Sequence, residues 1–260
     1  MRRLLRTVVV RTFRRTSTFQ ENKTMKKVFL TALALVLLPA FVVAQDKQLT
    51  AKEKEEGWVS IFDGKTFDGW KGNEPEEGFY VKDGCITGKG GRNHLFYMEE
   101  IGDFELKIDC KINKGGNSGL YFSTPWVEGN WPVQGFELQI NSSHTDPIKT
   151  GSLYNIISIF KAPHGDDEWF TYYITVKGST LTVRINDEVL YVYNDPLERA
   201  MRERQGGRQG GAVNANAAGN APARPITEAN KRISQKGHIA LQQHDPGTVP
   251  QFKNVFLKKL

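Results

Sequence analysis

Cysteine is scarce in this chain, where two of the 260 residues are Cys. Two thiols cannot build a disulfide framework or a four-thiolate zinc site, so packing and hydrogen bonds must hold the fold together. Cys85 and Cys110 are either two separate buried thiols or one disulfide, and the sequence leaves both open. With 39% apolar and 25% charged residues, the composition excludes complete disorder, collagen and a multi-span membrane protein.

Several catalytic motifs are also missing. The chain has no phosphate-binding loop of the G-x-x-x-x-G-K-[ST] type, no G-x-S-x-G turn, no H-E-x-x-H and no C-x-x-C. Nucleotide-driven, serine-hydrolase and zincin chemistry therefore lack their usual residues.

The net charge of +6 invites a nucleic-acid partner, but the charge is unevenly placed. Residues 1–44 hold nine of the 35 Lys and Arg residues and a single Glu, so residues 45–260 contain 26 basic and 28 acidic side chains. A slightly acidic remainder has no general attraction to phosphate. We therefore expect no nucleic-acid partner.

Long apolar runs are absent apart from one near the N-terminus. Two lysines after Met25 precede an apolar run over residues 28–43, and small residues precede a plausible cleavage point after Ala44. The run is shorter than the roughly 20 residues of a membrane span. The pattern predicts a Sec-type signal peptide over 25–44 and a periplasmic or secreted protein without membrane contact after cleavage. Residues 1–24 are predicted to be a disordered upstream extension.

Residues 45–260 are predicted to form a single all-β domain. Apolar and charged residues alternate over 104–112, which is typical of a half-buried strand. Further strands are indicated at 136–140, 170–177, 181–185, 189–193, 238–243 and 255–260. Turn pairs such as Asp83-Gly84 separate the strands. Many short strands without intervening helices favour a jelly-roll β-sandwich of two antiparallel sheets.

One segment departs from the strand pattern. The Gly/Ala/Asn-rich residues 205–232 have almost nothing to bury, so we predict a flexible, low-complexity insert within the domain. Asp195 and Pro196 immediately before it provide a helix cap and a favoured first helical residue. This pattern predicts one short helix over 196–205.

The alternation also predicts which side chains leave the core. If the apolar residues of 136–140 lie between the sheets, Glu137, Gln139 and Asn141 face outward. The same reasoning turns outward Tyr121, Ser123, His238, Gln242 and His244. Beside a loop carrying Trp126 and Trp131, this face suits a sugar, because aromatic rings contact C–H faces while amides and acids bind hydroxyls. An ordinary solvated surface is the alternative.

Six blocks in the mature region form a recognisable series. They read G-W-V-S-I-F-D-G-K-T-F-D-G-W at 57–70, N-S-G-L-Y-F-S at 117–123, G-F-E-L-Q-I at 135–140, T-G-S-L-Y at 150–154, E-W-F-T-Y-Y-I-T-V-K-G at 168–178 and G-H-I-A-L-Q-Q-H at 237–244. In this order they resemble the 3-keto-disaccharide hydrolase domain family over nearly all of 57–260. The resemblance implies a concanavalin A-like jelly roll. Ser123 departs from the family pattern, since many members have Arg there.

The resemblance also implies an enzyme that cleaves 3-keto-glycosides, with a glycoside or oligosaccharide as substrate. A carbonyl at C3 acidifies the C2 proton, so a base can remove it; the enolate then expels the C1 substituent, and water adds to the product. Direct hydrolysis is the other route. The chemistry requires a base near C2, a donor or divalent metal at the enolate oxygen, and an acid for the leaving group. No cofactor is certain, and the metal stays open.

By this resemblance Glu137 is the candidate base or metal ligand, and Gln139 orients it or binds a hydroxyl. His144 or His244 is the candidate acid or base. The remaining candidate substrate contacts are Asn117, Tyr121, Trp126, Trp131, Tyr154, Lys161 and Gln242. A non-catalytic, lectin-like module that binds glycans with the same face is the alternative function, because fold does not settle function.

Overall fold

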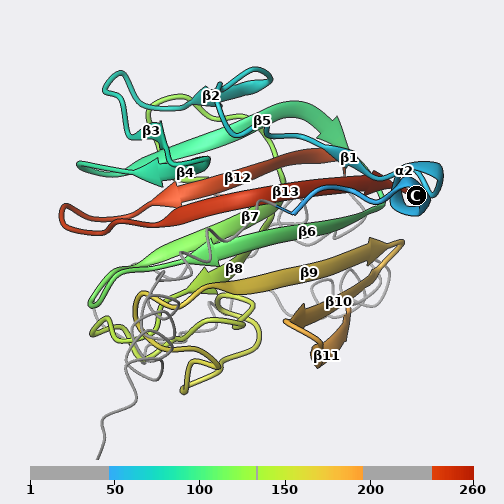
Figure 1. Ribbon diagram of the computed structural model, residues 1–260. Helices are drawn as coiled ribbons and strands as arrows, with labels where there is room; N and C mark the ends of the chain where they lie inside the picture. The colour runs from blue at the N-terminus through green and yellow to red at the C-terminus, as the bar shows by residue number, and fades with distance from the viewer. Residues whose placement is uncertain (1–46, 133, 196–235) are drawn as a thin grey trace, which may run out of the picture. The chain divides into compact units, whose positions relative to one another are not determined.

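The computed structural model describes residues 47–132, 134–195 and 236–260 (Figure 1). These residues belong to one compact unit, Asp46–Leu260. The predicted signal peptide, the insert and the helix over 196–205 lie outside the described residues. They stay predictions, as do the domain boundaries and the localisation.

Two antiparallel sheets make up the described part of the chain. The eight-stranded sheet has the order β11-β10-β9-β6-β13-β4-β3, with β1 pairing along β13, and the five-stranded sheet has the order β2-β5-β12-β7-β8. The elements are α2 (Ala51–Glu55), β1 (Val59–Ser60), β2 (Trp70–Gly72), β3 (Phe79–Lys82), β4 (Cys85–Gly88), β5 (Asn93–Ile101), β6 (Phe104–Lys111), β7 (Ser118–Thr124), β8 (Phe136–Ile140), β9 (Phe170–Lys177), β10 (Thr180–Ile185), β11 (Glu188–Asn194), β12 (Gly237–Gln243) and β13 (Gln251–Lys259). The predicted sandwich is confirmed.

Strand alternation fills the space between the sheets. Leu106 and Ile108 of β6 and Leu138 of β8 are fully buried in one apolar cluster that draws on both sheets. Glu105 and Lys107 lie between the buried residues of β6 and take part in ion pairs on the other face. Period-two patterning therefore identified the core face of these strands, because successive side chains of a strand point to opposite sides.

Two irregular points shape the eight-stranded sheet. Asp83 and Gly84 both have positive φ, 51° and 73°, and turn the chain tightly between β3 and β4, as the Asp-Gly pair predicts. In β13 the register shifts between Lys253 and Phe256, and Asn254 has φ 51°. This bulge lets β13 pair with β6 along its length, with β4 near its start and with β1 further on.

The helix that the structure describes was not foreseen. Helix α2 begins with a capping box, in which the Thr50 hydroxyl accepts the N–H of Glu53 and the Glu53 carboxylate accepts the N–H of Thr50. These bonds and the ion pair with Lys107 lower the pKa of Glu53 to about 2. A T-x-x-E sequence at 50–53 was the available signal for this helix start.

The two cysteines are separate buried thiols and form no disulfide. The Cys110 Sγ lies in the core, where burial raises its pKa well above the usual value. Of the two alternatives left by the sequence, the structure therefore shows separate thiols.

Tyr172 of β9 ties the two sheets together. Its fully buried hydroxyl donates to the Gln139 carbonyl at 2.7 Å and accepts the Gly151 N–H at 2.7 Å. Burial raises the pKa of Tyr172 well above its usual value, so the phenol stays protonated and can donate. The bond reaches across the core to β8 at the residue that follows Leu138.

We expect Tyr172→Phe to lower the free energy of unfolding by about 1–3 kcal/mol, because it removes two buried hydrogen bonds of 2.7 Å. The Gly151 N–H and the Gln139 carbonyl then keep only the longer bond of 3.3 Å between them. Denaturant titration measures the change. The matched variant Tyr193→Phe removes a hydroxyl that makes only a 3.4 Å contact with Asp195, and it should change stability by about 0.5 kcal/mol or less. Equal losses in both variants would contradict the cross-sheet role.

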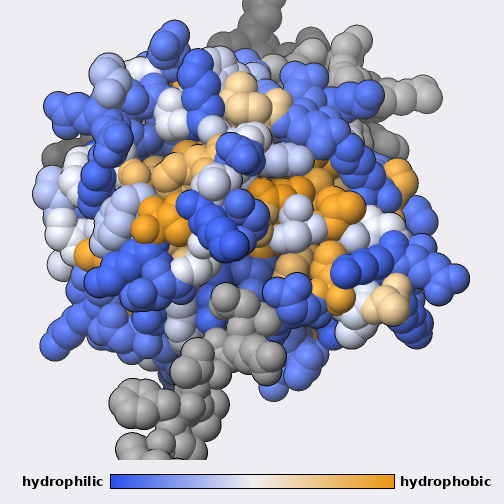
Figure 2. All heavy atoms as spheres, turned by 45° about the horizontal axis from the view of Figure 1, so that its top comes forward, coloured by the Kyte–Doolittle hydropathy of each residue, from blue (hydrophilic) through white to orange (hydrophobic). Residues whose placement is uncertain are grey.

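Apolar residues are gathered on one face of the described part of the chain. Figure 2 shows a face on which apolar residues gather near the centre, within a rim of hydrophilic residues. Across 47–132, 134–195 and 236–260, no helix has the length and apolar character needed to cross a membrane.

Candidate active site

The outer face of the five-stranded sheet gathers most of the predicted site residues. Strand register sets them in transverse rows, because residues paired across neighbouring strands point to the same side. The first row runs through Lys71, Phe96, Ala240, Tyr121 and Glu137. The second contains the pair His94–Gln242 and the pair Gly119–Gln139. The prediction that Glu137 and Gln139 leave the core is confirmed by this arrangement.

A hydrogen-bonded network, here called the Glu137 network, joins Glu137, Tyr121 and Gln242. The Tyr121 hydroxyl donates to Glu137 Oε2 at 2.6 Å, and Gln242 Nε2 donates to the Tyr121 hydroxyl at 2.9 Å. A hydroxyl that donates to a carboxylate stabilises its negative charge. The network therefore holds one carboxylate oxygen in a fixed position.

The network is more buried than the sequence analysis expected. Glu137 is 7% exposed, Tyr121 and Gln242 are each 1% exposed, and Gln139 is also 1% exposed. The expectation of a face open to solvent is thus wrong at these residues, because neighbouring side chains and loops pack over them. Gln242 Oε1 is buried and accepts no hydrogen bond from the described residues, so one acceptor inside the site is unused.

Gly119 leaves room for the acid. A Cβ built at Gly119 would lie 2.6 Å from Glu137 Oε1 and 3.0 Å from its Cγ. Glu137 Oε1 therefore occupies space that the Cβ of any other residue at position 119 would need. Gly119 lies inside strand β7, beside the acid.

The next polar layer continues along the strands. Gln139 Nε2 donates to Asn117 Oδ1 at 3.0 Å, and the Asn117 N–H donates to the Thr248 hydroxyl at 3.1 Å. Asn141 binds its own loop through Nδ2, which donates to the carbonyls of Asp146 and Ile148. Two predicted contacts, Asn117 and Gln139, are therefore directly bonded to each other.

Both predicted tryptophans lie on the loop between β7 and β8. Trp126 packs edge-on against Phe96, with ring centroids 5.0 Å apart, and Trp131 packs against His94 at 5.3 Å. The Lys71 ammonium lies over the Trp126 ring at 4.5 Å, and the Arg92 guanidinium lies over the Trp131 ring at 5.5 Å. The loop thus covers the β5 side of the outer face, and a cation already contacts each indole.

The structure brings His144 and His244 together with an acid that sequence reasoning missed. The two imidazole rings lie 6.4 Å apart, and Trp131 contacts His244 at 5.0 Å. Asp245 Oδ2 lies 2.6 Å from His244 Nδ1 and 3.8 Å from His144 Nε2. We call these three residues the histidine end of the site. Its signal in the sequence was the Asp that directly follows the last block.

His94 was also missed, although alternation pointed to it. The sequence N-H-L-F-Y of β5 places Leu95 in the core, so His94 and Phe96 must face the same outer side as Tyr121. His94 is fully buried, contacts the Tyr121 ring edge-on at 5.3 Å and has its Nε2 3.4 Å from Gln242 Nε2.

The two remaining predicted contacts, Tyr154 and Lys161, lie on the segment between β8 and β9. Tyr154 is half-buried and approaches β8 through its backbone, whose N–H donates to the Glu137 carbonyl at 2.9 Å. Lys161 is exposed on the loop that precedes β9. The structure shows no bond from the Lys161 side chain to the Glu137 network or to the histidine end.

Three acidic residues, 166–168, lie on the loop before β9, and Asp166 is hydrogen-bonded to other side chains of the protein. Asp166 accepts the hydroxyls of Ser142 and Ser143, and these bonds lower its pKa. His164 is stacked on Phe170 at 4.1 Å, and burial lowers its pKa. Among the described residues, no group of three or more His, Cys, Asp or Glu side chains is arranged to hold a metal ion.

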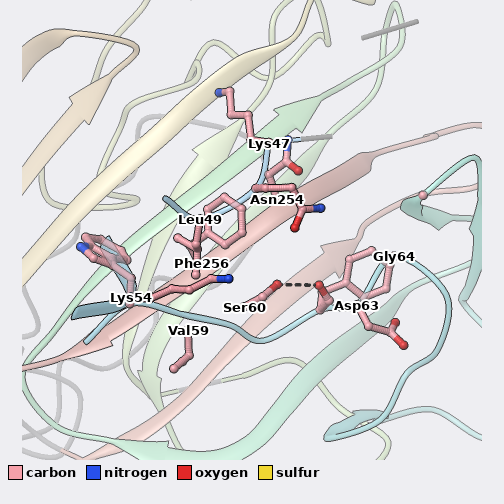
Figure 3. Close-up of a pocket in the computed structure, with 13 residues that line it drawn as sticks. Lys47, Leu49, Lys54, Val59, Ser60, Asp63, Gly64, Asn254 and Phe256 are labelled. Atoms are coloured by element: carbon pink, nitrogen blue, oxygen red, sulfur yellow. Dashed lines mark hydrogen bonds between the residues drawn. The ribbon is translucent and has the colours of Figure 1, made fainter. Parts of the chain in front are cut away.

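A separate cavity of about 610 Å³ lies on the outer face of the other sheet (Figure 3). It is lined by α2 and β1 residues and by Asn254 and Phe256 of β13, and it contains none of the predicted site residues. In Figure 3 the Lys54 side chain extends across it toward Ser60. The cavity and the Glu137 network therefore lie on opposite sides of the sandwich.

Comparison with known proteins gives matches over most of the chain. Residues 57–258 match the 3-keto-alpha-glucoside-1,2-lyase-like domain. A 3-keto-disaccharide hydrolase of Bacteroides thetaiotaomicron is 29% identical over a stretch that covers 58% of this chain and 66% of the relative. The chain thus spans slightly less than two thirds of that relative's length.

Two crystal structures from Parabacteroides distasonis share the fold. One, provisionally described as a glycosyl hydrolase, is 27% identical with a TM-score of 0.65, and the match covers 83% of this chain and 100% of that one. The other is 19% identical with a TM-score of 0.56 and covers 78% and 99%. At this lower identity the likeness shows the fold alone.

The family match includes both sheets from β1 to nearly the end of β13, and with them the Glu137 network and the histidine end. The resemblance carried by the six sequence blocks is confirmed. This chain belongs to the family of 3-keto-alpha-glucoside-1,2-lyase-like domains.

Proposed function

We propose that this protein cleaves the glycosidic bond of 3-keto-glycosides on the outer face of its five-stranded sheet. In this proposal the C3 carbonyl acidifies the proton at C2, and a base removes that proton to leave an enolate. The enolate expels the C1 substituent as its C1–O bond breaks, and an acid donates a proton to the departing oxygen. Water then adds its hydroxyl to C1 of the resulting double bond, and its proton restores the acid. The protonated base exchanges its proton with solvent and delivers one to C2 in the last step, so the protein ends unchanged.

The observation that carries the proposal is the fixed, buried carboxylate of Glu137. Its Oε2 is held by the Tyr121 hydroxyl at 2.6 Å, and its Oε1 rests over Gly119. A buried acid that is oriented by the Tyr121 hydroxyl and packed against a glycine has the form of a general base. Family membership gives this acid a substrate class.

Neighbouring amides and histidines supply the remaining parts. The amides of Gln139 and Gln242 lie beside the acid on the same face and suit hydroxyl or enolate oxygens. His144 and His244 are 24% and 30% exposed, so either can reach a leaving group bound above the sheet. The indole rings of the loop between β7 and β8 contact the C–H faces of the sugar. We place the activity outside the cytoplasm because residues 25–44 have the pattern of an export signal.

A chromogenic 3-keto-glucoside and the matching ordinary glucoside test this proposal. We expect release of the chromophore from the keto compound only, because the ordinary sugar lacks the carbonyl that acidifies C2. Parallel reactions with a chelator determine whether a divalent metal takes part. Running the reaction in deuterated water separates the two routes: elimination and hydration place deuterium at C2, whereas direct hydrolysis does not.

Binding of either sugar without release of the chromophore would instead support the lectin-like alternative. Release from both sugars at similar rates would point to a conventional glycosidase and would contradict the proposed chemistry.

A further inference from the structure

Asp245 has no role in the reaction as proposed so far, yet it is the most exposed member of the histidine end. Its side chain is 41% exposed, against 24% for His144 and 30% for His244. Its contact with His244 is at ion-pair distance without the alignment of a hydrogen bond. The 3.8 Å gap to His144 is too long for a hydrogen bond. The carboxylate therefore keeps capacity to accept hydrogen bonds from a ligand.

The histidine end is held in place by its loop. The Lys149 ammonium donates to the carbonyls of His144 at 2.6 Å and of Asp146 at 2.8 Å. The Asp146 N–H donates to His144 Nδ1 at 3.0 Å, so in the neutral imidazole the proton is on Nε2, the atom that faces Asp245. A donor and an acceptor thus face each other across a gap of 3.8 Å.

The histidine end lies at a distance from Glu137 along the outer face of the five-stranded sheet. The His144 N–H binds Asn141 Oδ1, and Asn141 is four residues beyond Glu137, a separation of about 13 Å in an extended chain. His244 likewise lies two residues beyond Gln242, which belongs to the Glu137 network. Between the two ends lie the bonded amides of Gln139 and Asn117. The spacing suits two adjacent sugar rings.

The proposed reaction orients the keto sugar and the leaving-group sugar on the outer face. The proposed base must reach C2 of the keto sugar, so that ring lies at Glu137. The proposed acid, His144 or His244, must reach the C1 substituent, so this substituent extends along the face toward the histidine end. A neutral sugar in that position offers hydroxyl groups, for which a carboxylate is an acceptor and an imidazole N–H is a donor.

We propose that Asp245, together with His144 and His244, forms the binding subsite for the leaving-group sugar, and that this subsite makes the protein prefer 3-keto-disaccharides to simple 3-keto-glycosides. The inference rests on the proposed function, because the orientation of the substrate depends on Glu137 as the base. Asp245 acts here as a specificity-determining residue that touches the substrate but not the reacting atoms.

Two substrates separate binding from chemistry. Wild type and Asp245→Asn are compared on a 3-keto-disaccharide and on methyl 3-keto-glucoside, whose leaving group is poor but carries no second ring. We expect kcat/KM to fall about tenfold on the disaccharide, mainly through KM, and to change less than about twofold on the methyl glycoside. The matched control Asp187→Asn, in an exposed turn, should leave both values unchanged.

Two other kinetic outcomes overturn the subsite. Equal losses on both substrates would assign Asp245 to the chemistry or to the fold, and unchanged values on both would remove it from the site. If wild type acts on neither substrate, the proposed function itself fails. Equilibrium binding of the two sugars to wild type and Asp245→Asn then decides the subsite: a loss confined to the disaccharide supports it, and no difference overturns it.

Discussion

Replacing Glu137 by Gln is expected to reduce kcat for a 3-keto-glucoside by about 10²–10⁴-fold, the range that a general base contributes. The amide has nearly the same shape as the carboxylate but cannot take up the C2 proton. The Tyr121 hydroxyl, which now donates to Glu137 Oε2 at 2.6 Å, can donate to the amide oxygen instead, so the local structure should survive. Steady-state kinetics with the chromogenic substrate measure the loss.

Binding provides the decisive second readout for this variant. Because the change leaves the pocket shape intact, we expect the substrate dissociation constant to stay within about threefold of wild type. Glu188→Gln, an exposed acid on β11, is the matched control and should retain full activity. A Glu137→Gln enzyme with kcat near wild type would remove this acid from the mechanism and leave the lectin-like reading as the stronger one.

Gly119→Ala is expected to reduce kcat/KM by about 100-fold, the cost of misplacing a catalytic group by about 1 Å. Its new Cβ would lie 2.6 Å from Glu137 Oε1, so the carboxylate must move and loses its alignment with Tyr121. The backbone is not the obstacle, because Gly119 lies in a regular strand pair with Gln139.

Gly91→Ala is the matched control for this steric effect, since nothing lies within 4 Å of a Cβ at Gly91 and its φ is not positive. Its activity and stability should equal those of wild type. Thermal unfolding of Gly119→Ala checks that the fold is retained. Loss of activity together with global unfolding would show a packing role, whereas full activity would mean that the position of Glu137 does not matter.

Period-two patterning predicted much of the fold because it depends only on neighbours along the chain. It separated Leu138 from Glu137 and Gln139, and the structure places these residues on the core and outer faces of β8. The same alternation in β5, with Leu95 in the core, also places His94 on the outer face. Helix α2 was missed because a five-residue helix has too little periodic signal, although its capping box was readable.

Other parts of the site depend on residues that are distant in sequence. Gln242 and Tyr121 are 121 residues apart, yet they share a hydrogen bond because β12 pairs with β7. The covering of the face, and the cations over Trp126 and Trp131, depend on how loops fold back over the sheet. No local sequence pattern encodes such contacts. The burial of Glu137, where a solvent-open face was expected, could therefore not be predicted from the sequence.

The sequence by itself determined the two-sheet architecture, the family and the face on which the acid lies, because alternation and motif order are local properties of the chain. Only the tertiary structure decided that Tyr121 and Gln242 hold Glu137, that Gly119 makes room for it, and that Asp245 joins the two histidines at the far end. Those relations arise from strand pairing across long sequence separations, where the partners are fixed by the packing of the whole sandwich.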